Sequence, residues 1–449
     1  MDVVVLSRIQ FAMNIAFHFI FPPLSIGLGL LLVIMEGMYL KTKLLKYKEL
    51  TQFWINIFAL TFAIGVATGL VQSFAFGTNW AKYSHFVGDV FGSALAAEGI
   101  FAFFLESGFL GILLFGWDRV KPGIHYFATI MVCLGAHFSA LWILIANSWM
   151  QTPAGHIIEQ QGDRSRAVIV DFWKMVFNPS SMDRIVHVVL GCWLAGIFFM
   201  ISVAAYYFLK KRHDEMARSM MKIGLPLAIV VLILQLFSGD SSADVVAKHQ
   251  PAKLAAFEGV FKTEPGTAVS VIGWVDTDNE KVYSLKIPGG LSFMTYGNFH
   301  SAVTGLDKFP KEDWPNVHVV FQTYHLMVWM WGFMVLTALF GLYYTWKKKL
   351  REVRWLLWVM VFSVIFPQVA LQAGWVSAEM GRQPWIVYNI LRTKDGVSRS
   401  ISAGQVKGSI TMFSIINLLL FVLFLFLLDR KIKYGPKLLP TEYRDVYGA

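Results

Sequence analysis

The sequence carries ionisable side chains inside segments that are otherwise apolar. Such groups are costly within a bilayer, and where they occur they commonly bind ligands, pair with one another or move protons. We therefore treat each of them as a candidate functional residue. The set comprises His18, Glu98, Glu106, His137, His187 and Glu379.

Four side chains that can ligate iron come from four different apolar segments. His18, His187, Met327 and Glu379 fall toward the same face once successive segments are given alternating directions, so we expect them at one level near the outer face. Helical bundles hold cofactors with side chains from facing helices, and His with Met is a known axial pair for low-spin heme iron. The pattern predicts heme binding.

Simpler interpretations of these residues stay open. Met327 and Met330 belong to one helical stripe, which more often serves packing than ligation. His325 and Met327 lie about 200° apart around a helix, so both cannot face one heme. Glu379 could instead form an ion pair with Arg382, three residues later. We interpret the other histidines as interfacial side chains: His85, His125, His213, His249, His300 and His318.

The composition is that of an integral membrane protein. Of the 449 residues, 56% are hydrophobic and 15% are charged, whereas soluble domains carry about 25% charged residues. This excludes soluble globular, disordered and collagen-like chains. The net charge of +10 indicates Lys- and Arg-rich cytoplasmic loops, and we expect no nucleic-acid partner. Cys133 and Cys192 both lie in apolar runs, and we expect two separate core thiols.

Nine apolar runs are long enough to cross a bilayer, which needs about 20 residues. The sequence therefore predicts an all-α integral membrane protein, a bundle of nine transmembrane helices. We divide it into helices one to six (1–238), an extracytoplasmic loop (239–324), and helices seven to nine with a tail (325–449). The runs cover residues 14–39, 53–78, 92–116, 124–147, 187–209, 220–238, 325–346, 355–378 and 409–428.

Lysine and arginine gather in every second connection, and such connections face the cytoplasm. The clusters surround Lys46, Arg119, Lys211, Lys348 and Lys431. This alternation predicts an N-terminus outside and a C-terminus in the cytoplasm. The N-terminus lacks a basic start and a small-residue cleavage site, so we expect no cleaved signal peptide.

The segment 239–324 is the longest polar connection. Connections of this length tend to be functional. It contains the stretch KHQPAKLAAFE, with Lys253 and Glu258, followed by strand-like runs at 269–275 and 281–287. We expect it to be partly ordered and partly mobile.

Several motifs, taken together, resemble subunit I of the cytochrome bd quinol oxidases. They extend over nearly the whole chain, so the resemblance concerns the complete bundle and its long loop. The motifs are LSRIQF (6–11), FHF (17–19), EGI (98–100), FFLES (103–107), FGWDR (115–119), SALWILIAN (139–147), KLAA (253–256), AGW (373–375) and AEMGRQPW (378–385).

The resemblance implies three hemes. His187 and Met327 would be the axial pair of a low-spin heme b (b558-type). His18 and Glu379 would ligate the two high-spin groups, a heme b (b595-type) and a heme d, in an order that the resemblance leaves open. Trp375 would lie between hemes.

The resemblance also implies roles in electrostatics, quinol oxidation and proton transfer. Arg382 would neutralise heme propionates, which suits its forked guanidinium. Lys253 and Glu258 would handle quinol on a water-exposed loop, the quinol-binding loop or Q-loop. The proton path to the oxygen site would comprise Glu98, Glu106, Ser107, Ser139 and His125.

The implied protein is a respiratory terminal oxidase of the bacterial cytoplasmic membrane. It would oxidise quinol at the outer face and reduce O2 to water with cytoplasmic protons, which generates a proton motive force without a pump. Its partners would be subunit II, a small third subunit and the surrounding lipid.

The sequence departs from the family pattern in the seventh segment. Position 325 is His where familiar members carry Arg, and Gly332 lies one residue further from Met327, so Met330 stays an alternative ligand. The loop is short, which indicates a short-loop member. Two alternatives remain: a cofactor-free proton-coupled transporter or channel that uses Glu98 and Glu106, and a membrane cytochrome that relays electrons without touching oxygen.

Overall fold

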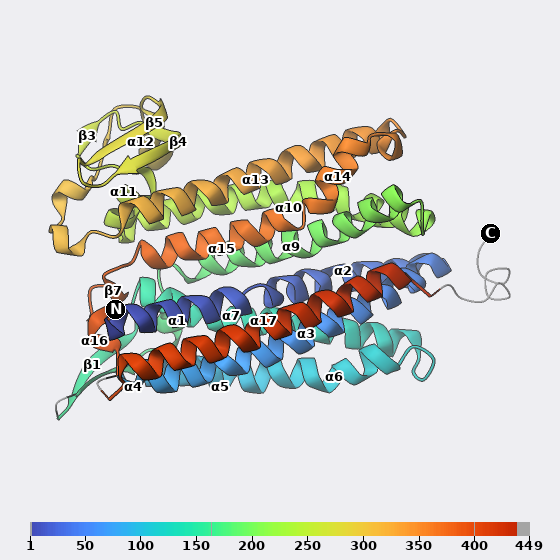
Figure 1. The fold of residues 1–449 in the computed structure, drawn as a ribbon, viewed down its shortest axis with the longest axis horizontal. Coiled ribbons are helices and arrows are strands. Elements are labelled where there is room, and N and C mark those ends of the chain that lie inside the picture. The colour runs from blue at the N-terminus through green and yellow to red at the C-terminus, as the bar shows by residue number, and fades with distance from the viewer. Residues whose placement is uncertain (1, 163, 399, 438–449) are drawn as a thin grey trace.

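Nine apolar helical spans run side by side in the computed structural model, which describes residues 2–162, 164–398 and 400–437. Figure 1 shows an elongated bundle with the N-terminus and most loop segments at one end. In lipid a backbone must satisfy its own hydrogen bonds, and these Leu-, Ile-, Val- and Phe-rich runs do so as helices. The predicted all-α membrane bundle is confirmed for this part of the chain. The spans are α1 (Val3–His18) with α2 (Phe21–Thr42), α3 (Leu45–Asn79), α5 (Gly88–Ala97) with η1 (Glu98–Phe103) and α6 (Phe104–Phe115), α7 (Pro122–Gln151), α9 (Ser181–Lys210), α10 (Asp214–His249), α13 (Val317–Trp346), α14 (Arg354–Phe362) with α15 (Ile365–Met380), and α17 (Ala403–Tyr434).

The first span differs from its predicted bounds of 14–39. It extends over Val3–Thr42 and is interrupted at residues 19–20, between α1 and α2. Pro22 and Pro23 stand in the first turn of α2, where a missing N–H donor is tolerated and the helix restarts. His18 therefore ends a helix within a long span, deeper than its predicted place near the outer end.

A π-helical turn, η1, interrupts the third span and begins at Glu98. Such turns occur frequently at functional sites. Apolar composition does not reveal them, because a wider turn leaves hydropathy unchanged. The turn alters how Glu98 is placed around the axis relative to Glu106, eight residues later.

The sixth span is longer than its predicted end at residue 238, because α10 continues to His249. The start of the predicted loop is thus helical. The two strand-like runs are confirmed as an antiparallel hairpin of β4 and β5. The elements of the long loop are α11 (Pro251–Glu258), β3 (Glu264–Pro265), β4 (Val269–Asp276), β5 (Lys281–Ile287), α12 (Gly290–Tyr296), β6 (Ala302–Val303), η2 (Leu306–Lys308) and η3 (Lys311–Asp313).

The other connections contain short elements. Two small antiparallel pairs, β1 with β2 and β7 with β8, lie in the fourth and eighth connections. The short elements of these connections are α4 (Ala81–Phe86), β1 (His156–Gln161), β2 (Arg164–Ile169), α8 (Phe172–Val176), η4 (Leu350–Glu352), β7 (Trp385–Val387), β8 (Leu391–Arg392) and α16 (Thr393–Gly396).

Helix α9 forms the centre of the packing and contacts α10, α2 and α14. Small residues let it approach α2 closely: a Cβ added at Gly196 would lie 2.7 Å from the Cα of Gly27. Close crossings at small residues are typical of membrane helix pairs. Cys133 and Cys192 are buried free thiols, as predicted.

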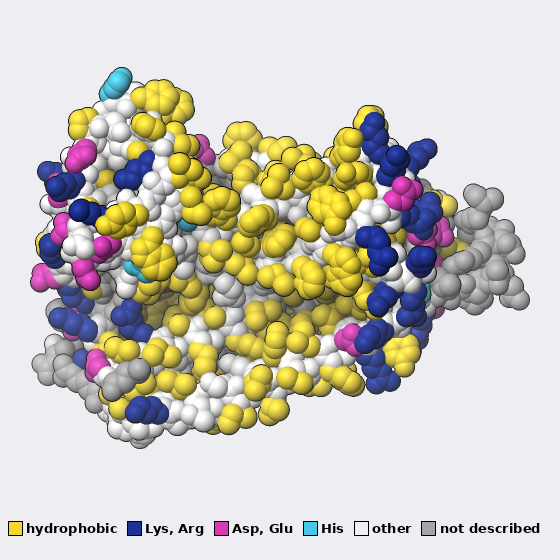
Figure 2. All heavy atoms as spheres, turned by 45° about the horizontal axis from the view of Figure 1, so that its top comes forward, with side chains coloured by type: hydrophobic (Ala, Val, Ile, Leu, Met, Phe, Trp, Pro, Cys, Tyr) yellow, Lys and Arg dark blue, Asp and Glu magenta, His cyan; other side chains and the backbone are white. Residues whose placement is uncertain are grey.

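Charges separate the two ends of the bundle. Figure 2 shows, on one face, an apolar band across the middle, Lys and Arg gathered at one end, and charges of both signs at the other. We call these the basic end and the loop end, because the latter carries α11 and the β4–β5 hairpin. This is the charge pattern that the sequence predicted for alternating connections.

Candidate functional site

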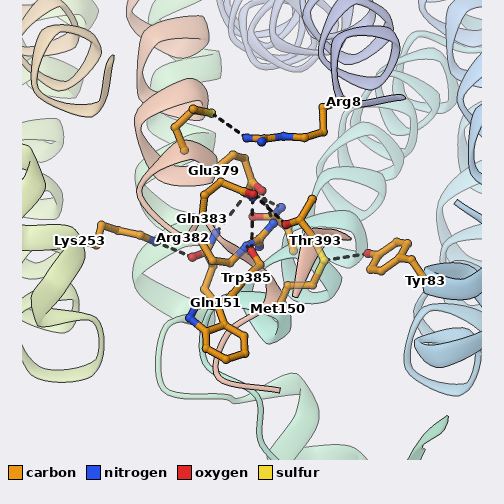
Figure 3. Close-up of polar contacts among 12 residues, drawn as sticks. Arg8, Tyr83, Met150, Gln151, Lys253, Glu379, Arg382, Gln383, Trp385 and Thr393 are labelled. Atoms are coloured by element: carbon orange, nitrogen blue, oxygen red, sulfur yellow. Dashed lines mark hydrogen bonds and ion pairs between the residues drawn. The ribbon is translucent and has the colours of Figure 1, made fainter. Parts of the chain in front are cut away.

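Glu379 lies near the last turn of α15, in a polar cluster at the loop end (Figure 3). Its Oε1 accepts hydrogen bonds from Asn147 Nδ2 at 3.0 Å and Gln151 Nε2 at 3.3 Å. Its Oε2 accepts from Arg382, so the ion pair considered as an alternative is present. The carboxylate is held in a fixed orientation by three donors.

Positive groups surround this cluster. The Arg382 side chain is 3% exposed and its Nη1 has no hydrogen-bond partner; Nε of Arg184 is buried in the same way. A cavity of about 660 Å³ lies beside Met380 and is lined by further cations, including Arg8 and Arg392. Guanidinium groups with free donors suit carboxylates such as heme propionates.

Lys253 reaches the same cluster from the loop. Its Nζ donates to Gln151 Oε1 at 2.5 Å, and Gln151 in turn donates to Glu379 (Figure 3). Lys253 is buried, and burial, together with the nearby cations Arg184 and Arg382, lowers its pKa well below the usual value. Hydrogen bonds through Gln151 therefore connect the long loop to the end of α15.

Glu258 lies on a different face of α11. Five residues separate it from Lys253, which is about 140° around a helix. It accepts hydrogen bonds from the backbone N–H of Ser270 and from Tyr324, and burial raises its pKa to about 7. Its side chain is 4% exposed. The prediction that Glu258 is water-exposed was wrong, because β4 and α13 cover it, and it does not share one pocket wall with Lys253.

Met327 and His187 lie at the same height in the bundle. The Sδ of Met327 on α13 is 2.7 Å from where a Cβ on Gly374 would stand. On α9, a Cβ added to Gly191, one turn beyond His187, would meet Leu371 at 2.9 Å. Because α9 and α15 run in opposite directions, His187 is level with the residue after Gly374. The two predicted low-spin ligands therefore occupy one layer among α9, α10, α13 and α15.

His18 lies deeper than the other candidates. Its Nδ1 is 2.9 Å from Thr68 Oγ1. Gln372 on α15 donates to the carbonyl oxygen of Ala16 at 2.8 Å. Because α1 and α15 run in opposite directions, His18, two residues after Ala16, is level with about residue 370 of α15. Nine residues of α15 separate that level from Glu379, or about 14 Å. The expectation of a single layer was wrong: the candidates are staggered, because the first span is interrupted at His18.

The carboxylates of the third span face α7. Ser139 Oγ donates to Glu98 Oε1 at 2.6 Å. Glu106 is 8% exposed, and a Cβ added at Gly135 would lie 2.5 Å from its Cγ. Ser107, the residue after Glu106, is exposed in the structure.

A buried cluster near the basic end joins His125, a predicted residue of the proton path, to Glu36, which was not predicted. Glu36 on α2 accepts from Thr129 Oγ1 at 2.5 Å, and its Oε1 is 2.7 Å from His125 Nδ1. The ring of Trp117 lies 4.0 Å from that of His125. Glu36 is 1% exposed. A glutamate six residues before the end of an apolar helix is the sequence signal that could have predicted this cluster.

Two other histidines have structural contacts. His137 accepts from Trp193 Nε1 at 2.8 Å and lies 2.7 Å from the carbonyl oxygen of Cys133. His325 contacts the carbonyl oxygens of Phe321 and Ser270 at 2.9 and 2.8 Å. His325 therefore fastens the loop to α13.

The donor set fits heme better than a bare metal ion. Within the described ranges, no three His, Cys, Asp or Glu side chains converge on one point. A porphyrin supplies four equatorial nitrogens, so one or two protein ligands suffice. The His187 ring lies against Gln235, whose Nε2 is 3.0 Å from Nδ1 and 3.2 Å from Nε2 of the imidazole. Trp375 is half-buried, one residue after Gly374.

Nine apolar spans in the described residues, a His and a Met side chain at one height, and carboxylates within the spans are features expected of a membrane protein of the respiratory cytochrome class. The chain belongs to the cytochrome bd terminal oxidase subunit I family, whose family model matches residues 6–436. The predicted resemblance is confirmed. The chain is thus part of a bacterial membrane quinol oxidase that uses heme and works with a second subunit.

Individual relatives agree over almost the full length. The chain is 38% identical to cytochrome bd ubiquinol oxidase subunit 1 of Bacillus subtilis (strain 168), covering 97% of this chain and 94% of the relative. It is 34% identical to cytochrome bd-II ubiquinol oxidase subunit 1 of Escherichia coli (strain K12), covering 98% of each. The solved bd oxidase of Geobacillus thermodenitrificans superimposes with a TM-score of 0.89 at 28% identity, covering 97% of this chain and 99% of that one.

Proposed function

We propose that this chain carries the three hemes of an electrogenic quinol oxidase, takes electrons from quinol at the loop end and receives protons from the basic end. The observation that carries the proposal is the common height of Met327 and His187 within one four-helix group. When bound, the hemes supply electron transfer and, where one axial position is open, oxygen binding and cleavage.

Each ligand has a distinct role in this proposal. His187 and Met327 hold the low-spin heme b, with Met330 as the alternative to Met327. His18 and Glu379 hold the high-spin heme b and heme d, in an order that stays open. Arg382, with its unpaired Nη1, would neutralise propionates beside Glu379.

Glu258 is proposed as the acceptor of the proton released by quinol. A base whose pKa lies near the working pH is efficient, because it is ionised and can still hold the proton it accepts. Its hydrogen bonds to Ser270 and Tyr324 fix the carboxylate between the hairpin and α13. Lys253 positions α11 by its bonds to Gln151 and Gln250.

Protons for oxygen reduction are proposed to follow α7. This helix carries His125 with Glu36 near the basic end, Gly135 against Glu106 farther along, and Ser139 bonded to Glu98. Fourteen residues from His125 to Ser139 span about 21 Å, so water must bridge the gaps. Intramembrane carboxylates in series are typical of proton relays.

The orientation follows from the basic connections, which we propose to be cytoplasmic. Quinol protons are then released outside and oxygen protons are taken from inside, so charge separation needs no pump. A small third subunit is also proposed.

The test is a reduced-minus-oxidised visible spectrum of the complex with quinol-dependent oxygen uptake. We expect low-spin b, high-spin b and d bands, and the Met327→Leu variant should lose the six-coordinate low-spin signal. A colourless complex would indicate the transporter instead, and low-spin bands alone would indicate an electron relay.

A further inference from the structure

The β4–β5 hairpin has one exposed apolar face. Its outward side carries the cross-strand pairs Ile272 with Leu285 and Trp274 with Tyr283, followed by Ile287. All five side chains are between 54% and 66% exposed. Apolar cross-strand pairs on a solvated sheet face are unusual, because that face normally carries polar residues. The face therefore needs a covering partner.

The outer edge of β4 is hydrogen-bonded along the first turns of α13. His318 lies 3.0 Å from the carbonyl oxygen of Val275, and Gln322 donates to that of Gly273 at 2.9 Å. His325, a further turn along, contacts Ser270 at 2.8 Å. The hairpin thus runs beside the helix, from residue 318 to residue 325, and does not stand beyond its end. Figure 1 shows β4 and β5 together on one side of the N-terminal part of α13.

The depth of the hairpin relative to the membrane follows from the exposed side chains of α13. Exposed apolar side chains on this helix begin at Leu326, directly below His325, and continue to Trp346. These 21 residues span about 30 Å, which is the thickness of the hydrocarbon core. Residues 318–325 then lie in the headgroup layer, and the hairpin lies there with them.

The chemistry of the exposed face fits that layer. Trp and Tyr are enriched at membrane–water interfaces, where an apolar ring with a polar edge is suited. Trp274 and Tyr283 form such a pair, and Trp274 also contacts the ring of His318 with centroids 4.4 Å apart. Figure 2 shows that apolar side chains continue from the loop end into the middle band.

From this we infer that the β4–β5 hairpin is a membrane-interface element whose apolar face is seated in the outer lipid leaflet. The occupant of the face is the phospholipid surface around α13. The inference is independent of the heme ligands. One consequence rests on the proposed function. The backbone N–H of Ser270, at the end of the hairpin farthest from its turn, donates to Glu258, so the lipid contact would lie next to the proposed quinol base.

A site-directed fluorophore tests the inference. Leu285→Cys in the complete oxidase is labelled with an environment-sensitive maleimide and reconstituted in nanodiscs of mixed phosphatidylglycerol and phosphatidylethanolamine. Asp278→Cys, in the turn at the other end of the hairpin, is the matched control. Cys133 and Cys192 are buried, and the unsubstituted protein measures any background from them.

We expect the label at position 285 to be quenched by lipids with a doxyl group high on the acyl chain and to be protected from aqueous iodide. The label at 278 should show the reverse. Iodide quenching at 285 without lipid quenching would overturn the inference, because the hairpin would then stand in water. Protection from both quenchers would also overturn it, because a protein subunit would then cover the face.

Discussion

At the scale of single residues, glycines decide how close the candidate groups come to neighbouring helices. Met327 reaches α15 only because Gly374 has no side chain, and Glu106 reaches α7 only because of Gly135. Real Cβ atoms do not approach other heavy atoms to 2.7 or 2.5 Å, so a methyl group at either position must displace its neighbour. This gives two specific perturbations that leave the functional side chains chemically intact.

The substitution Gly374→Ala should displace the sulfur of Met327. We expect loss or weakening of the low-spin heme b signal, as in Met327→Leu, because the added methyl occupies the approach of Sδ. Visible and magnetic circular dichroism spectra measure the effect. Gly332→Ala, where an added Cβ meets nothing within 4 Å, is the control and should retain the signal. Equal spectra in both variants would remove Met327 from the ligand set.

The substitution Gly135→Ala should move Glu106 and slow proton delivery. Glu106→Gln removes the proton-carrying group, and we expect oxygen uptake to fall by about 100-fold, the lower end of the usual contribution of a positioned acid or base. Gly135→Ala should give a smaller loss with heme bands unchanged. Gly108→Ala is the control, because nothing lies near its added Cβ. Full activity in Glu106→Gln would rule out the relay.

Quinol oxidation should depend on the ionisation of Glu258. Its pKa of about 7 lies above the ordinary value for a glutamate because the side chain is buried. Below pH 7 the group is neutral and cannot accept a proton; above pH 7 it is a carboxylate and can. We therefore expect kcat/KM for quinol to rise between pH 6 and 8. Glu258→Gln should lower the rate and abolish the rise, and a retained rise would assign the titration to another group.

At the scale of elements, helix α11 carries two candidate functional residues on different faces. Lys253 points to the Glu379 cluster, while Glu258 points to β4 and α13. The helix begins at Pro251 and ends before Gly259, whose φ of 68° a side chain rarely adopts. A rigid eight-residue helix thus couples the position of the quinol base to the end of α15.

The close crossing of α2 and α9 should be a stability determinant. A Cβ at Gly196 would lie within 2.4 to 2.7 Å of the Gly27 backbone, which cannot rotate away. We expect Gly196→Ala to destabilise the protein by about 1–3 kcal/mol, the usual cost of overpacking. Thermal unfolding followed by heme release measures this. Gly92→Ala, with open space at its Cβ, should unfold like the parent; an unchanged midpoint in Gly196→Ala would show that the helices can separate freely.

At the scale of the whole molecule, the charge distribution predicts the orientation in the membrane. Lys and Arg gather at the end opposite the long loop (Figure 2). The bundle also leaves most of α17 and of the α5–α6 span unburied, which gives wide apolar faces to lipid or to the second subunit. Both properties belong to the assembled bundle and not to any one helix.

Orientation can be measured with two cysteine probes. A thiol at Asp278 in the β4–β5 turn should react with an impermeant maleimide in spheroplasts. A thiol at Lys348, in the connection after α13, should react only after the membrane is opened. The opposite pattern would place the long loop in the cytoplasm and would invert the proposed proton path.

Much of the fold was predictable because it depends on local composition. An apolar run of sufficient length becomes a helix in lipid wherever it stands, so nine spans followed from hydropathy alone. The hairpin of β4 and β5 followed from alternation. The break before Pro22 and the π turn at Glu98 were not predicted, because both depend on how a long span fits its neighbours.

The sequence by itself determined the family, the number of spans and the types of residue available for heme, quinol and protons. Only the tertiary structure decided which of them meet: that Met327 and His187 share a height, that His18 lies about 14 Å deeper than Glu379, that Lys253 and Glu258 face apart, and that Glu36 joins His125. The physical reason is that hydropathy determines which segments enter the membrane. The depth of each side chain, and the neighbour toward which it points, are determined by contacts between helices far apart in the chain.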